Sequence, residues 1–350
     1  MGWVRRAVVN VVGVLFGCLA IYVLVEGGSS AFLLAWDLGF KTAGGLRSGN
    51  YVRFDPELGW SNIPNAKLVD FNGPGQHVTI DPNGLRITPA REASDTITVL
   101  CSGDSFTFGV GAGDEQTWCY RLGADAPDIA TLNAGEAAYG IGQMYLKARR
   151  LSDQIEWDVH VVAFIADDIR RATTGEFVGR NKPRFVLDGG ALRLERETVT
   201  ESSALYAWMR ANKRIYANLR VLELGRRIGA KLSGAPPKPP SPDSTKELVG
   251  AIFEATAKMN AAQGRRTLFV FLPSGPGVDQ TDVAWRPRVA EECQRRKLDC
   301  ADLVAPFRAL DETKQVAMFE PATRHYDADG NRWVAERIAE LVRTSTSSAP

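Results

Sequence analysis

The chain has 350 residues, of which 45% are hydrophobic and 24% charged, and its formal net charge is +1. This is the composition of an ordinary globular protein, long enough for one large domain with attachments. A net charge so close to zero excludes a general polyanion-binding role, so no nucleic-acid partner is expected.

The N-terminal segment is far more apolar than the rest. In the stretch 7–25 the only strongly polar residue is Asn10, and this length is close to the ~20 residues that span a hydrocarbon core. Arg5 and Arg6 precede the stretch, which favours a cytoplasmic N-terminus. We therefore expect residues 1–30 to be an uncleaved single-pass anchor in the inner membrane, with the rest of the chain on the extracytoplasmic side.

Three other interpretations of this segment remain open. A cleaved signal peptide or a buried core helix has a similar composition. A lipoprotein signal is a further option, because Leu15-Phe16-Gly17-Cys18 loosely resembles a lipobox. Against it, the chain stays apolar for seven residues past Cys18.

A short lead-in over 31–95 is rich in proline, asparagine and glycine. Within it "HVTI" predicts a strand, and "DPNG" predicts a turn in which Gly84 takes a positive φ. We expect a small β-rich region between the anchor and the main domain.

Apolar runs and amphipathic stretches alternate from residue 96 onward. Strands are expected in "TITVLCS", "DIATLNAG", "WDVHVVAFIA", "TLFVFLPSG" and "LDCADLV". Helices are expected in "DEQTWCYRLGA", "GIGQMYLKARRLS" and "DGNRWVAERIAELV". Continuous apolar strands alternating with helices indicate a parallel sheet covered on both faces. The predicted fold class is α/β, with three layers, over residues 96–345.

An insertion is expected at about 170–262. It contains "RFVLDGGALRLE", which predicts a hairpin. A helical stretch over 203–230 follows and carries several arginines and lysines. Their side chains form either a patch for anionic lipid or an acidic polymer, or simply a solvated helix face. The proline-rich stretch 234–243 predicts an extended linker.

The chain has five cysteines, and none shows the spacing of metal ligands. No metal or cofactor is expected. Cys101 and Cys119 fall on an apolar strand and a helix, so we expect them in the core. Cys293 and Cys300 flank a helix-to-strand turn and could form a disulfide in an oxidising compartment.

The first expected strand of the main domain ends in Gly-Asp-Ser. Ser105 therefore lies beyond the carboxyl end of a parallel strand, where functional groups collect in such sheets. A serine hydroxyl needs a base to act as a nucleophile. Of the three histidines, His160 is inside a strand and His77 is in the lead-in, whereas His325 lies in a loop before the last helix. By elimination His325 is the candidate general base.

These motifs resemble the blocks of the SGNH/GDSL hydrolase superfamily. "CSGDSFTFGVGAGDEQTW" is similar to the first block, whose serine is the nucleophile. "LNAGEAAYGIGQ", "VVAFIADDIRR" and "RHYDADGNRWVAERI" are similar to the second, third and last blocks. "YVRFDPELGW" and "VTIDPNGLR" look like the lead-in of membrane-anchored members. The resemblance covers roughly residues 51–342 and implies a flavodoxin-like three-layer α/β/α fold.

The resemblance also assigns supporting residues, with departures. The oxyanion-hole glycine of the second block aligns with Ala138, whose N–H survives the change. The oxyanion-hole asparagine of the third block aligns with Asp167, and an ionised carboxylate cannot donate a hydrogen bond. Two alternatives remain: burial keeps Asp167 protonated, or its side chain points elsewhere. The triad aspartate aligns with Ala322. Glu320 is then the candidate to orient His325; the alternatives are a backbone carbonyl and a bare Ser-His dyad.

Two classes of function follow. The first is a membrane-anchored serine esterase or acyltransferase that acts through a Ser105 acyl-enzyme. By family analogy its substrate is an acyl ester, above all O-acetyl, of an envelope or extracellular polysaccharide. The second is a degenerate domain that binds glycan or a polysaccharide-assembly protein without turnover.

Overall fold

The computed structural model describes residues 2–40, 51–92, 96–204, 208, 240–276 and 280–344. The chain divides into two compact units, one of residues 1–49 with 202–239 and the other of residues 50–201 with 240–350. The arginines and lysines of the stretch 203–230, and most of the linker predicted at 234–243, lie outside the described residues.

The first unit contains helix α1 (Gly2–Phe40). Its segment Gly2–Phe32 is long and apolar enough to cross a membrane, although a signal sequence can have the same length and composition. The expected apolar N-terminal helix is therefore present, and it extends beyond residue 30.

The second unit is built on a parallel sheet of five strands. They are β5 (Ile97–Gly103), β6 (Ile129–Asn133), β7 (Val159–Phe164), β12 (Arg266–Phe271) and β13 (Cys300–Asp302). Their order across the sheet is β13-β12-β7-β5-β6, and all neighbours are parallel. Every carboxyl end thus lies at one edge, as the predicted fold class requires.

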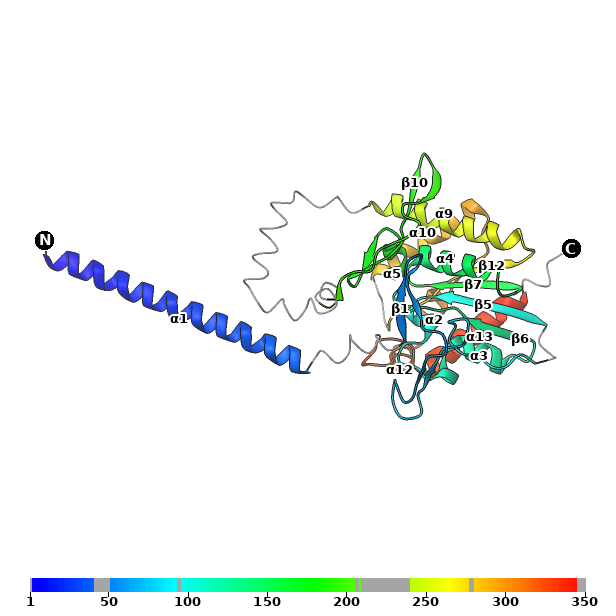
Figure 1. Cartoon of the computed structure of the whole chain (residues 1–350), viewed down its shortest axis with the longest axis horizontal. Helices are drawn as coiled ribbons and strands as arrows, with labels where there is room; N and C mark the ends of the chain where they lie inside the picture. Colours follow the sequence, from blue (N-terminus) through cyan, green and yellow to red (C-terminus); the bar gives the residue numbers. More distant parts are fainter. Residues whose placement is uncertain are drawn as a thin grey trace. The chain divides into compact units, whose positions relative to one another are not determined.

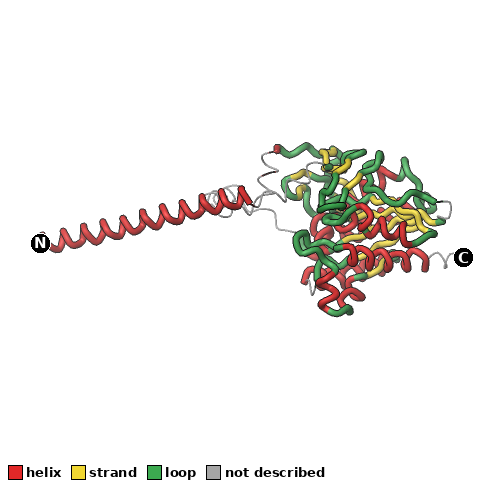
Figure 2. The backbone as a smooth tube through the Cα atoms, turned by 90° about the horizontal axis from the view of Figure 1, so that it is seen from below, coloured by secondary structure: helices red, strands yellow, loops and turns green. Residues whose placement is uncertain are grey.

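Helices cover both faces of this sheet (Figure 1, Figure 2). One face packs against α3 (Trp118–Asp125) and α13 (Ala328–Thr344). The other packs against α4 (Ile141–Leu151), α5 (Ala166–Ala172), α9 (Pro242–Ala261) and α10 (Gln280–Arg296). On β7, Val161 and Ala163 join the first core, and Val162 and Phe164 the second. Because both faces of the sheet are covered, most residues of β7 are apolar, and His160 is its one polar residue.

Short elements complete the connections at the carboxyl edge. They are α2 (Ser105–Phe108), the 3₁₀ turn η2 (Asp114–Gln116), α11 (Val304–Arg308) and α12 (Glu312–Ala317). The lead-in forms two antiparallel pairs, β1 (Val52–Asp55) with β2 (Gly59–Asn62), and β3 (Lys67–Leu68) with β4 (Val78–Thr79). The predicted turn is present, with φ +78° at Gly84.

In the described part of the range 170–262, expected to be an insertion, the structure has two hairpins and one core helix. The hairpins are β8 (Glu176–Phe177) with β9 (Arg180–Asn181), and β10 (Phe185–Asp188) with β11 (Ala191–Leu194). The second is the predicted hairpin, with positive φ at Gly189 and Gly190. The end of the range is helix α9, which packs against the sheet.

Two disulfides lie in the second unit. Cys293 pairs with Cys300, as the sequence allowed. Cys101 pairs with Cys119 and ties β5 to α3; this bond was not predicted from the sequence. Both its cysteines are fully buried, so the expectation that they belong to the core is correct but incomplete.

Loss of either disulfide should lower the free energy of unfolding by a measurable amount. The loop-entropy relation gives about 3 kcal/mol for the 18-residue separation of Cys101 and Cys119 and about 2.4 kcal/mol for the 7-residue separation of Cys293 and Cys300. We expect Cys119→Ala to shift the denaturant midpoint more than Cys293→Ala. Free thiols at all four positions in protein recovered from an oxidising compartment would contradict the pairing.

Candidate active site

Ser105 lies on the turn that joins β5 to α2, at the carboxyl edge of the sheet. The Asp104 carboxylate caps α2 by accepting the Phe106 N–H at 2.9 Å. A Cβ on Gly103 would lie 1.9 Å from Thr107 Oγ1, so only glycine allows this turn. Together the cap and the glycine hold Ser105 half-buried at the rim.

The structure brings His325 to Ser105 across 220 residues of chain. His325 Nε2 lies 2.8 Å from Ser105 Oγ, and Nδ1 lies 2.8 Å from the Thr323 carbonyl oxygen. Because a carbonyl can only accept, Nδ1 carries the proton and Nε2 is left to accept the serine hydroxyl. The ring also packs against Phe106, with centroids 4.7 Å apart. This is the geometry that a general base requires.

The other two histidines lie elsewhere, as the elimination argument assumed. His77 Nδ1 accepts the Asp70 N–H in the lead-in. His160 is fully buried in β7, between Ser102 Oγ at 2.8 Å and the Asn260 amide at 2.9 Å. Burial lowers the pKa of His160 to about 3, so its ring stays neutral and structural. Among the described residues, no group of three His, Cys, Asp or Glu side chains could hold a metal ion.

The base should remain active in mildly acidic solution. Burial lowers the pKa of His325, against the opposing charge of Asp104 and the Thr323 hydrogen bond. Only the neutral imidazole accepts a proton, so activity is lost as the pH falls through this lowered pKa. We expect kcat/KM for a small acetyl ester to hold its plateau below about pH 6.5, the ordinary pKa of histidine. An acid limb centred above pH 7 would contradict this assignment.

A backbone carbonyl, not an acidic side chain, contacts the second nitrogen of the His325 ring. The structure does not put Glu320 on the His325 ring: its carboxylate accepts the Ala322 N–H at 2.7 Å. The Glu320 N–H instead bonds the His325 carbonyl at 2.8 Å, which fixes the loop. The Thr323 carbonyl orients the ring, one of the arrangements that the sequence left open.

The aligned oxyanion residue Ala138 adopts a left-handed backbone. Its φ is +69°, which favours glycine and costs an alanine roughly 1–2 kcal/mol. The segment lies against the nucleophile turn, since the Glu136 N–H bonds the Gly103 carbonyl at 3.1 Å and a Cβ on Gly135 would lie 2.3 Å from Phe108 N. Within the described part of the chain, no group accepts a hydrogen bond from the Ala138 N–H.

The third aligned residue, Asp167, is engaged by two arginines. Its Oδ1 lies 2.6 Å from Arg170 Nη2 and its Oδ2 2.8 Å from Arg171 Nη2. A carboxylate so paired accepts hydrogen bonds and has no proton to donate. The asparagine-like donor is therefore missing, but the negative charge is balanced.

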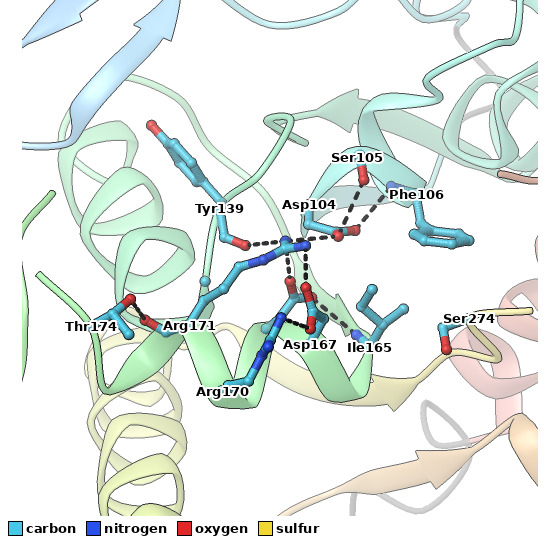
Figure 3. A network of polar contacts seen from close by, with 12 residues as sticks. Asp104, Ser105, Phe106, Tyr139, Ile165, Asp167, Arg170, Arg171, Thr174 and Ser274 are labelled. Carbon is cyan, nitrogen blue, oxygen red and sulfur yellow. Dashed lines mark hydrogen bonds and ion pairs between the residues drawn. The ribbon is translucent and has the colours of Figure 1, made fainter. Parts of the chain in front are cut away.

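Arg171 connects the parts of the site (Figure 3). Its Nη1 lies 3.2 Å from Asp104 Oδ2, 2.8 Å from Asp168 Oδ1 and 3.0 Å from the Tyr139 carbonyl. In the figure the guanidinium lies between Asp104, next to Ser105, and the carboxylates of α5. Burial disfavours the charge of Arg171, yet the surrounding carboxylates raise its pKa, so it stays a cation.

Sequence reasoning missed both Asp104 and Arg171 as working residues. Asp104 Oδ2 lies 3.3 Å from Ser105 Oγ, longer than the 2.8 Å contact to His325, so the hydroxyl proton goes to the histidine. The available signal was "ADDIRR", in which acids and arginines sit three and four residues apart on one helix.

The lead-in contributes a buried arginine to the carboxyl edge of the sheet, where Ser105 lies. Arg86 is 0% exposed, and its guanidinium donates to the carbonyls of Phe108, Gly109 and Ala112 and to Asp114. These bonds hold the loop that follows the nucleophile. That loop lies close to the segment just before His325: a Cβ on Gly111 would be 2.8 Å from Thr323 Oγ1.

Comparison with solved structures returns GDSL and SGNH proteins. A psychrotrophic esterase from Pseudoalteromonas sp. is 12% identical, with a TM-score of 0.40, and the match covers 72% of this chain and 99% of that one. A member of the lipolytic G-D-S-L family from Veillonella parvula is 13% identical, with a TM-score of 0.38, covering 69% and 96%. A GDSL-like lipase from Bacteroides thetaiotaomicron is 9% identical, with a TM-score of 0.38, covering 75% and 93%.

No protein-family model matches the sequence, and no curated protein matches it. The Veillonella and Bacteroides proteins are named after the G-D-S-L motif, which the sequence motifs of this chain also resemble. At these TM-scores the case for function rests on the geometry of this chain, namely a parallel α/β sheet with a serine–histidine pair at its carboxyl edge.

Proposed function

We propose that this protein is a membrane-anchored serine esterase or acyltransferase. The observation that carries the proposal is the 2.8 Å contact between Ser105 Oγ and His325 Nε2, with the ring oriented from its other nitrogen. The proposed substrate is an acyl ester, above all O-acetyl, on an envelope or extracellular polysaccharide. The polysaccharide comes from family analogy, and the ester chemistry comes from the site.

The reaction proceeds through an acyl-enzyme. Ser105 Oγ attacks the ester carbonyl carbon while His325 Nε2 takes the hydroxyl proton. The tetrahedral intermediate collapses, the bond to the leaving sugar oxygen breaks, and His325 returns the proton to that oxygen. Water or another sugar hydroxyl then attacks the acyl carbon while His325 Nε2 takes its proton, the bond from that carbon to Ser105 Oγ breaks, and His325 returns the proton to Oγ. Water gives hydrolysis, and a hydroxyl gives transfer.

The oxyanion of the intermediate meets the N–H groups of Ser105 and Ala138. Backbone donors of this kind stabilise developing charge without reorganisation. Asp167 cannot act as the third donor, and its charge would oppose the oxyanion. Arg171 offsets that charge and places a cation one hydrogen bond from Asp104, the residue before the nucleophile.

The second candidate is a domain that binds glycan, or an assembly partner, without turnover. Asp167 in the oxyanion position and a neutral carbonyl behind His325 favour it. The intact Ser105–His325 contact favours the enzyme, so we place the enzyme first.

We propose the extracytoplasmic side of the inner membrane as the location. Helix α1 is apolar over Gly2–Phe32, and Arg5 and Arg6 lie at its start, which favours an N-terminus held in the cytoplasm. Disulfides persist in oxidising compartments, and the two of the second unit support the same side.

The proposed activity is tested with the full chain in detergent and an O-acetylated oligosaccharide. We expect release of acetate, or transfer of acetyl to an added unacetylated oligosaccharide, and neither in His325→Ala. Glycan binding with no acetate release or transfer, for several acetylated oligosaccharides, would favour the non-catalytic alternative.

A further inference from the structure

A polar cavity of about 250 Å³ lies beside the two hairpins that follow α5. Its walls include Lys182, Arg184, Glu195 and Arg196, together with Gly175 and Asn181. The volume is below the ~300–1,000 Å³ typical of drug-sized ligands, so the cavity suits one small polar group.

The charges of the cavity do not cancel. Arg184 is paired with Glu195 by two hydrogen bonds, of 2.7 and 2.6 Å. Neither Lys182 nor Arg196 forms an ion pair with any described residue. The cavity therefore offers an amine and a guanidinium that no carboxylate contacts as an ion pair, which is the chemistry that receives an anion.

Lys182 is the unusual member of the cavity. It is only 3% exposed, and no described residue accepts a hydrogen bond from its amine. Burying an ammonium without a hydrogen-bond partner costs free energy. Lys182 therefore lowers the stability of the fold unless a ligand pairs with its amine. These features fit a lysine that binds a ligand better than one that only fills space in the core.

The cavity adjoins the candidate active site through α5 and the first hairpin. The Lys182 N–H bonds the Gly175 carbonyl at 3.0 Å, which closes the hairpin β8–β9. Phe177 of that hairpin lies under the Arg171 guanidinium, 4.5 Å from ring centroid to Cζ. A polymer held at Ser105 could thus place a neighbouring unit on this side.

We propose that this cavity binds the carboxylate of an acidic sugar unit in the polymer that reacts at Ser105. The inference rests on the proposed function for the polymer, and it adds the substrate class: an acidic polysaccharide rather than a neutral one. Lys182 and Arg196 receive the carboxylate, and the Arg184–Glu195 pair shapes the wall.

Binding should weaken as the pH rises. Burial, together with the charges of Arg171 and Arg184, lowers the pKa of the Lys182 amine to about 7, against the opposing charge of Asp168. Glu195 and Arg196 are the other charged groups of the cavity. The ammonium that attracts a carboxylate is therefore populated below pH 7 and lost above it, so affinity falls between pH 6 and pH 8.

The test uses the full chain carrying Ser105→Ala, so that binding is measured without turnover. Trigalacturonic acid and the neutral trisaccharide maltotriose are titrated at pH 6 by calorimetry. We expect the acid to bind, and Lys182→Met to weaken it about tenfold or more. Arg193→Met is the matched control, since Arg193 lies on the neighbouring hairpin and pairs with the exposed Asp188. It should leave the affinity unchanged.

A thermal melt keeps the result interpretable. Removal of an unpartnered buried amine should raise the melting temperature of Lys182→Met, so a loss of binding would not be a loss of fold. Equal affinity for both trisaccharides, or an unchanged affinity in Lys182→Met, would overturn the inference. Hydrolysis of a small acetyl ester by the wild-type chain reports on the Ser105 site separately.

Discussion

Replacing Ser105 with alanine should reduce hydrolysis of p-nitrophenyl acetate by a factor on the order of 10³ to 10⁶. The variant keeps the backbone N–H donors but has no oxygen for His325 to activate at 2.8 Å. In serine hydrolases, loss of the nucleophile removes nearly all of the rate that the catalytic group provides. The measurement is kcat/KM for the purified full chain, with the melting temperature as a check of folding.

Ser102 offers a matched control three residues away. It also contacts a histidine, since its Oγ lies 2.8 Å from His160 Nε2, but both side chains are buried. Ser102→Ala should cost some stability and leave the ester hydrolysis within about a factor of two. If Ser102→Ala lost activity as fully as Ser105→Ala at equal folded fraction, the assignment of the nucleophile would be wrong.

Replacing Arg171 with methionine should have the second largest effect. The guanidinium is almost buried and pairs with Asp104, Asp167 and Asp168. Breaking a buried ion pair by removing one partner typically costs about 3–5 kcal/mol of stability. In the proposed site, where Asp167 takes the oxyanion position, its charge then loses the Arg171 partner, and we also expect kcat/KM to fall by roughly 10²–10³, the effect of one lost oxyanion donor. Activity is compared at a temperature where both proteins are folded.

Two further variants separate charge from packing. Arg171→Lys keeps the charge but loses the forked contacts, so it should recover part of the activity. Asp167→Asn removes the opposing charge, and its amide can donate; it should raise hydrolysis alone and partly restore it in the Arg171→Met background. A fall in Asp167→Asn would show that the carboxylate has a role of its own, and full activity in folded Arg171→Met would refute the role given to Arg171.

The sheet was predictable because most residues of its strands are apolar. The periodicity placed β5, β6, β7, β12 and β13 correctly, and Ser105 followed from its position after the first of them. His325 followed by elimination, since the chain has only three histidines. These features depend on local pattern and on rare residue types, which a single sequence displays.

Other contacts of the site could not be predicted, because they depend on where the backbone lies and not on which residue types are present. The Thr323 carbonyl orients His325, and any residue has a carbonyl. The role of Arg171 depends on which turn of α5 meets the end of β5. The Cys101–Cys119 bond joins β5 to α3, which lie in different layers. Such relations exist only once the three layers are assembled.

The most direct test of the serine–histidine assignment is peptide mapping after reaction with a fluorophosphonate probe, which modifies activated serines. We expect the label on the peptide that contains Ser105, and we expect His325→Ala to abolish nearly all labelling while the protein stays folded. Absence of label on that peptide in the folded wild-type chain, or labelling that is indifferent to His325, would contradict the assignment.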